Sequence, residues 1–142
     1  MSDCSAHRVP RAGLDPIDGP AAALAVVRLA VHLPPTPETV VLLLDHERCG
    51  AVISVVSDTH RPDDVLEVVE CLTGAAAGTD RVGAVVVASV RPGAVEPDPG
   101  DLDRWLEMSH ISDLVGIELV EWFVLGRDTW CPRDLIGEAP RW

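Results

Sequence analysis

Thiols and imidazoles are the side chains in this sequence that could bind a metal or act as nucleophiles. The four cysteines are far apart in the sequence, at Cys4, Cys49, Cys71 and Cys131. Zinc sites are usually built from closely spaced ligand pairs, and the sequence contains no Cys-x-x-Cys pair. His46 lies close to one cysteine, in the run Asp45-His46-Glu47-Arg48-Cys49. We therefore expect no structural zinc and interpret the cysteines as ordinary reduced residues.

A loop rich in proline and glycine carries the most suggestive polar side chains. The stretch from Arg91 to Gly100 reads Arg-Pro-Gly-Ala-Val-Glu-Pro-Asp-Pro-Gly, which no regular element tolerates. It follows a nearly apolar run, and loops that leave the end of a buried strand often carry binding sites. Asp98 can cap the next helix because Pro99 suits a first helical position. We expect a functional site to lie in this loop and its flanks.

Ser89, just before this loop, does not by itself predict a nucleophile. The Gly-x-Ser-x-Gly turn that exposes a catalytic serine is missing, and no histidine is close to Ser89 in the sequence. We interpret it as a structural serine at the end of a strand. His46 and His60 flank a predicted hairpin and could meet in space, although histidines in polar turns are usually solvated.

The elements that position these residues follow from hydrophobic periodicity. Nearly unbroken apolar runs predict central strands that are buried on both faces, whereas Glu118 and Glu121 predict a more exposed position for the last long strand. The first 18 residues show no period, so we expect a flexible tail followed by one domain over 19–142. We expect helices at 20–33, 62–74 and 99–116, an antiparallel hairpin at 39–57, strands at 81–90 and 117–125, and a short strand within 129–136.

The amino-acid composition limits which binding partners and which cellular location we expect for this protein. A chain of 142 residues with 47% hydrophobic residues can bury one core without disulfides or metal. Its net charge of -12 disfavours nucleic acid and anionic membranes as ligands, and favours a protein partner or a basic peptide. No apolar run resembles a secretory signal or a membrane span, so we expect a cytoplasmic protein.

The order of predicted elements is helix, hairpin, helix, strand, Pro/Gly loop, helix and strand. With the motifs below, this order resembles the JAB/MPN domain superfamily, and its RadC-like branch in particular. Members of that branch carry His-x-His-Pro-Ser-Gly after the central strand, then Pro-Ser-x-x-Asp at the start of a helix and a later Gly-Ile strand. The matching segments here are Val85-Val86-Val87-Ala88, Ser89-Val90-Arg91-Pro92-Gly93, Pro97-Asp98-Pro99-Gly100-Asp101, Val115-Gly116-Ile117-Glu118-Leu119 and Phe123-Val124-Leu125-Gly126, with Val40-Val41-Leu42-Leu43-Leu44-Asp45 upstream.

The resemblance covers about residues 36 to 137 and implies an α/β (α+β) fold, the cytidine-deaminase-like mixed sheet flanked by helices. It also implies a zinc ion held by two histidines and an aspartate, with an upstream glutamate that activates water. Here Ser89 and Arg91 stand in place of the two histidines, and Asp98 replaces the motif serine. Only Asp101 is retained among the ligands, and Glu38 is the candidate for the glutamate. Serine is a poor zinc ligand, and a guanidinium cannot bind a cation.

These departures favour a non-catalytic domain without metal or cofactor, acting as a protein-binding or scaffold module. Without the histidines, Asp98 and Asp101 would repel each other, so we predict that Arg91 pairs with Asp101 and closes the former pocket. Two alternatives stay open. One is a JAB-type metal-dependent hydrolase with a rearranged ligand set drawn from His46, His60, Asp98 or Asp101. The other is a Rossmann-like binder of a small molecule, although residues 45–50 form no glycine-rich phosphate loop.

Overall fold

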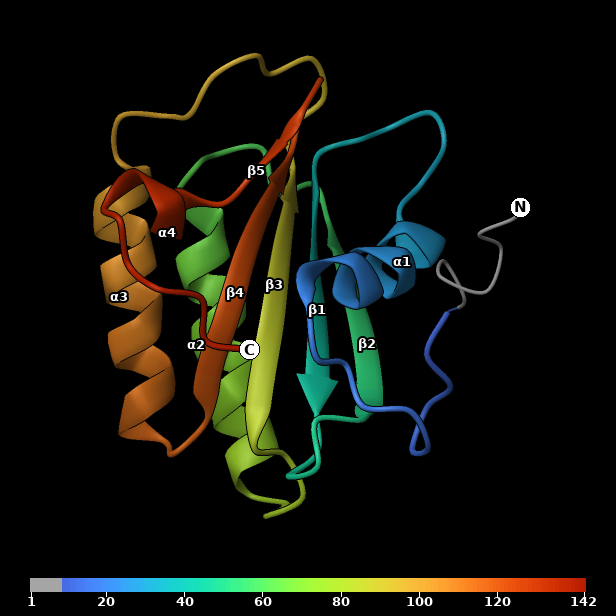
Figure 1. The fold of residues 1–142 in the computed structure, drawn as a ribbon. Coiled ribbons are helices and arrows are strands. Elements are labelled where there is room, and N and C mark those ends of the chain that lie inside the picture. Colours follow the sequence, from blue (N-terminus) through green and yellow to red (C-terminus); the bar gives the residue numbers. More distant parts are fainter. Residues whose placement is uncertain (1–8) are drawn as a thin grey trace.

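A computed structural model describes residues 9–142, which form a mixed α+β fold with one five-stranded sheet and four helices (Figure 1). The strand order is β2-β1-β3-β4-β5, in which β3 and β4 are parallel and all other neighbours are antiparallel. The elements are α1 (Pro20–Ala30), β1 (Glu38–Leu44), β2 (Gly50–Ser57), α2 (Asp64–Ala77), β3 (Ala84–Val90), α3 (Asp101–Leu114), β4 (Glu118–Leu125), β5 (Thr129–Trp130) and α4 (Pro132–Leu135).

Helices cover both faces of this sheet, with α1 against one face and α2 and α3 against the other (Figure 1). Successive side chains of a strand point to opposite faces, so Val41 and Leu43 pack in the core beneath α2 and α3, whereas Val40 and Leu42 pack beneath α1. Every residue of β1 and β3 is buried. This burial confirms the two predicted central strands, which have no face in contact with solvent and therefore few polar residues. The antiparallel pairing of β1 with β2 confirms the predicted hairpin.

The prediction of an exposed position for β4 is wrong. All residues of β4 after Glu118 are buried, and Glu121 is only 1% exposed. Arg133 of α4 donates from Nε and Nη2 to the Glu121 Oε1, at 3.1 and 3.0 Å. The carboxylate is therefore buried together with a counter-charge from a later part of the chain, and its polarity does not indicate solvent.

Residues 9–18 pack against the hairpin, which differs from the flexible tail expected for residues 1–18. Ile17 is 1% exposed and joins the core beneath α1. The Ile17 amide donates to the Arg48 carbonyl at 2.8 Å, and the Gly13 amide donates to the Gly50 carbonyl at 3.1 Å. This segment is held by one buried apolar side chain and by hydrogen bonds to the turn and the start of β2. Because it forms no helix or strand of its own, its sequence shows no hydrophobic periodicity. Residues 1–8, also assigned to the tail, lie outside the described residues.

Several element ends differ from the predicted ones. α1 ends at Ala30 rather than at residue 33, α2 continues through Gly74 to Ala77, and α3 begins at Asp101 rather than at Pro99. The expected strand within 129–136 is limited to Thr129–Trp130, after which Pro132 opens α4, since proline suits the first turn of a helix. Within residues 9–142, no helix has both the length and the apolar character needed to cross a membrane.

Candidate functional site

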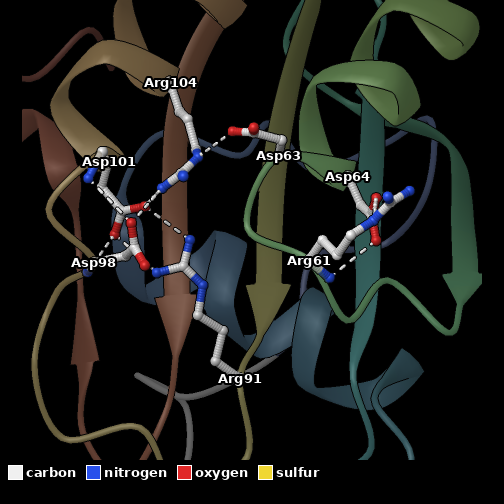
Figure 2. Close-up of polar contacts among 8 residues, drawn as sticks. Arg61, Asp63, Asp64, Arg91, Asp98, Asp101 and Arg104 are labelled. Carbon is white, nitrogen blue, oxygen red and sulfur yellow. Dashed lines mark hydrogen bonds and ion pairs between the residues drawn. The ribbon is translucent and has the colours of Figure 1, made fainter.

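The C-terminal end of β3 and the start of α3 bring three of the predicted site residues together. Ser89 and Arg91 are two residues apart at the end of the strand, so their side chains point to the same face of the sheet, the face covered by α2 and α3. The loop 91–100 then returns the chain so that Asp101 opens α3 beside Arg91 (Figure 2). Asp101 has no exposed surface.

The Asp101 carboxylate accepts hydrogen bonds on both oxygens. Arg91 donates from Nη1 to Oδ2 and from Nη2 to Oδ1, both at 2.8 Å. Arg104 Nη1 donates to Oδ1 at 3.0 Å, and the Asp98 amide donates to Oδ2 at 3.0 Å. The predicted pair of Arg91 and Asp101 is thus confirmed, in the two-bond geometry that suits a planar guanidinium. The four bonds occupy the acceptor sites of a carboxylate.

Arg104 is a central member of the cluster that the sequence analysis missed. It lies one turn after Asp101 on α3 and also donates to Asp98 Oδ1 at 2.7 Å and to Asp63 Oδ1 at 2.8 Å (Figure 2). Burial lowers the pKa of Arg104, but the hydrogen bonds to Asp98, Asp63 and Asp101 outweigh it and hold the pKa above its usual range. The spacing of three residues between Asp101 and Arg104 on a helix is the signal that could have indicated this contact.

Asp98 shapes the turn before α3 rather than capping the helix. The residue at the helix start is Gly100, whose amide donates to Asp98 Oδ1 at 3.0 Å, so Asp98 makes a turn with its own backbone two residues on. The hydrogen bond from Arg104 and, next, the one from the Gly100 amide hold the pKa of Asp98 below its usual value. Asp98 and Asp101 both accept from Arg104 Nη1, and this shared positive charge offsets the repulsion expected of two close carboxylates.

Ser89 is a buried partner of a tryptophan. Its Oγ accepts a hydrogen bond from Trp122 Nε1 at 2.9 Å, and the residue is 7% exposed. The Trp122 ring lies 5.6 Å from the guanidinium carbon of Arg91, which places a cation near an aromatic face. Ser89 therefore orients Trp122, and Trp122 in turn supports Arg91. This arrangement agrees with the interpretation of Ser89 as a structural serine.

Glu38 is not brought to this cluster. It shares the α1 face of β1 with Val40, whereas Ser89 and Arg91 lie on the other face of the sheet. Its carboxylate is buried, accepts a hydrogen bond from the His32 amide at 3.0 Å and lies 2.6 Å from His32 Nδ1. The neighbouring Thr39 faces the cluster instead. Glu38 therefore cannot reach a group bound at Asp101.

The two histidines considered for a rearranged metal site are also apart. His46 lies in the turn between β1 and β2, where its Nε2 is 3.2 Å from the Asp80 carbonyl oxygen. His60 follows β2, and β2 runs antiparallel to β1, so His60 lies at the opposite end of the hairpin. Across residues 9–142, no three His, Cys, Asp or Glu side chains are grouped so that they could hold a metal ion.

The side chains that stand in place of the zinc ligands do not fit that ion. Serine and a guanidinium supply no good ligand, and both oxygens of Asp101 already accept from two arginines and an amide. Two positive charges at this carboxylate would also repel an incoming cation. The arrangement holds the buried Asp101 carboxylate in place between two arginines.

A small cleft lies beside Arg91. It has a volume of about 50 Å³, enough for a few water molecules. Its lining comes from the start of β1, the segment from the end of β2 into the first turn of α2, and the end of β3 with the residue after it: Thr39, Thr59, His60, Arg61, Pro62, Val65, Ser89, Val90 and Arg91. The cleft therefore opens where three segments distant in sequence meet.

Two arginines outside the cluster also pair with acidic side chains. Arg48 pairs with Glu118, and Arg61 Nε lies 3.4 Å from Asp64 Oδ1.

Comparison with protein-family models gave no match for this sequence, and comparison with curated proteins gave none either.

Proposed function

We propose that this chain is a non-catalytic JAB/MPN-like domain of the RadC-like branch, which has lost its zinc site and acts as a binding or scaffold module. Two features support the proposal. The observed elements follow each other in the order on which the resemblance rests, from α1 to β4. The feature that carries it is the pair of 2.8 Å hydrogen bonds from Arg91 to Asp101, at the place that the resemblance assigns to zinc.

Arg91 supplies the charge that a metal would otherwise supply. A buried carboxylate is costly unless a positive group and enough donors surround it. A guanidinium is permanently charged and presents a planar pair of donors that matches the carboxylate. With Arg91 and Arg104 in place, both Asp101 oxygens are hydrogen-bonded and the carboxylate is oriented without an ion, so the end of β3 and the start of α3 remain joined. This favours a rigid binding surface over a reaction centre.

Rebuilding the ligand set tests this proposal. The variant combines Ser89→His, Arg91→His and Arg104→Gln, the last because Arg104 also occupies Asp101. We expect zinc at 100 times its dissociation constant to stabilise this variant by about 2.7 kcal/mol, measured as a rise in melting temperature, and to leave the parent protein unchanged.

A matched control carries Ser89→Ala, Arg91→Ala and Arg104→Gln. It removes the same arginines but adds no ligand, so zinc should not stabilise it. The same zinc response in the control and in the histidine variant, or no response in the histidine variant, would show that residues 89, 91 and 101 do not correspond to a former metal site.

A further inference from the structure

We propose that the cleft beside Arg91 binds a small oxyanion, a single carboxylate or phosphate group. The cleft lies between the start of β1, residues 59–62 and the end of β3, on the α2 face of the sheet. The inference rests on the proposed binding role of the domain and adds the chemical class of the ligand. Hydrogen-bond donors outnumber acceptors among the side chains that line the cleft.

The lining is basic in an acidic protein. The whole chain carries 23 acidic against 11 basic residues, yet none of the residues that line the cleft is Asp or Glu. Two arginines, one histidine and three hydroxyl groups supply its polar side chains. A cleft that offers many donors and no carboxylate favours an anion over a cation or a neutral sugar.

Two of the hydroxyl groups have a hydrogen left to donate. Ser89 Oγ accepts from Trp122 at 2.9 Å, and its own hydrogen has no acceptor among residues 9–142. Thr39 Oγ1 donates to Thr59 Oγ1 at 2.9 Å, which leaves the Thr59 hydroxyl hydrogen without an acceptor in the same part of the chain. Ser89 is 7% exposed and lines the cleft. A bound oxyanion would accept from both hydroxyls.

The two arginines contribute in different ways. Both Nη atoms of Arg91 donate to Asp101, which holds the guanidinium in place and compensates its positive charge. The side chain of Arg61 is 83% exposed, and its Asp64 contacts involve the Nε and the backbone amide (Figure 2). Within the described structure the Nη atoms of Arg61 have no partner. Arg61 is therefore the charged group that can close over a bound anion.

The size of the cleft and the charge of the molecule restrict the kinds of ligand that the cleft can bind. A volume of about 50 Å³ accommodates one oxyanion group rather than a nucleotide. A net charge of -12 repels a polyanion at long range, whereas a single small anion meets mainly the local donors. A carboxylate and a phosphate share the required acceptor oxygens, and the two can be compared directly.

The experiment is a titration of the full chain with inorganic phosphate and, separately, with acetate, at constant ionic strength. The reporter is the Trp122 indole Nε1–H resonance in a ¹H–¹⁵N correlation spectrum, because this group donates to Ser89 at the cleft wall. We expect a saturable shift with at least one anion. Arg61→Ala should weaken binding about tenfold, and Thr59→Val should also weaken it.

The matched control is Arg81→Ala, which removes an exposed arginine near the opposite end of β3 and should leave the affinity unchanged. No saturable shift with either anion would overturn the proposal, as would an affinity that Arg61→Ala leaves intact or that Arg81→Ala lowers equally. Zinc binding by the rebuilt ligand set is independent of this titration, so either proposal can fail alone.

Discussion

At the scale of single residues, the stability of the site depends on how Asp101 is compensated. This carboxylate is fully buried, and its two guanidinium partners come from different elements, Arg91 after β3 and Arg104 within α3. Removing an arginine from a buried carboxylate lowers the stability of the protein by more than the strength of the lost hydrogen bond, because the carboxylate stays buried without its partner. Arg91 is therefore expected to matter more for stability than the exposed ion pairs of the chain.

A double-mutant cycle with Arg91→Ala and Asp101→Ala measures this directly by urea denaturation. We expect a coupling free energy of about 1 kcal/mol or more, because the pair is buried and makes two hydrogen bonds. Arg11→Ala with Asp15→Ala is a suitable control, since both side chains of that pair are more than a third exposed, at 57% and 36%. Simple additivity of the Arg91 and Asp101 effects would contradict the buried pair.

At the scale of elements, the edge of the sheet beyond β4 is closed by the C-terminal segment. β5 pairs with only two residues of β4, and the rest of that edge is covered by the segment around α4. Arg133 holds Glu121 and also donates to the Glu138 carbonyl at 2.6 Å. Arg141 donates to the Leu119 carbonyl at 2.8 Å and lies 4.6 Å from the Trp105 ring centre. These contacts join the last residues to β4 and α3.

We predict that Arg133→Ala destabilises the protein by about 3–5 kcal/mol, because it leaves Glu121 buried without its counter-charge. Combining Arg133→Met with Glu121→Leu should recover most of that loss, since an apolar pair needs no compensation. Urea denaturation of the three proteins checks both expectations. If Arg133→Ala were as stable as the parent, α4 would not hold β4 in the way described.

At the scale of the whole molecule, charge decides what the protein can approach. The net charge of -12 is distributed over a chain that contains no lysine, and the basic lining of the cleft is local. Long-range repulsion is screened over about 8–10 Å at physiological salt, so it acts on extended polyanions more than on a small ion held within the cleft.

We therefore predict no measurable binding to duplex or single-stranded DNA at physiological salt, in a fluorescence-anisotropy titration. A protein that neutralises phosphates binds more weakly as salt rises, and this one has too few grouped cations to do so. Tight binding that falls steeply with salt would contradict the expectation. A control titration with free inorganic phosphate, at the same total phosphate concentration as the DNA, distinguishes binding of phosphate in the cleft from binding of the polymer.

The sequence by itself determined the local features of this protein. Apolar runs predicted the hairpin and the central strands, because a strand buried on both faces has no polar side. Proline and glycine placed the loop 91–100, and the resemblance, which sets Arg91 and Asp101 at neighbouring ligand positions, predicted their contact through charge compensation. These features depend on residues close in sequence or on simple charge compensation, which composition and spacing record.

Only the tertiary structure decided which side chains share a face and which charges are buried together. Glu38 and Thr39 are neighbours in sequence, but the pleat of β1 sends one beneath α1 and the other to the cleft. The sequence pattern indicates a surface position for Glu121, but its carboxylate is buried against Arg133. Arg104 of α3 likewise donates to Asp63, which precedes α2. Such contacts depend on strand register and helix packing over long separations, and periodicity within a single element carries no information about them.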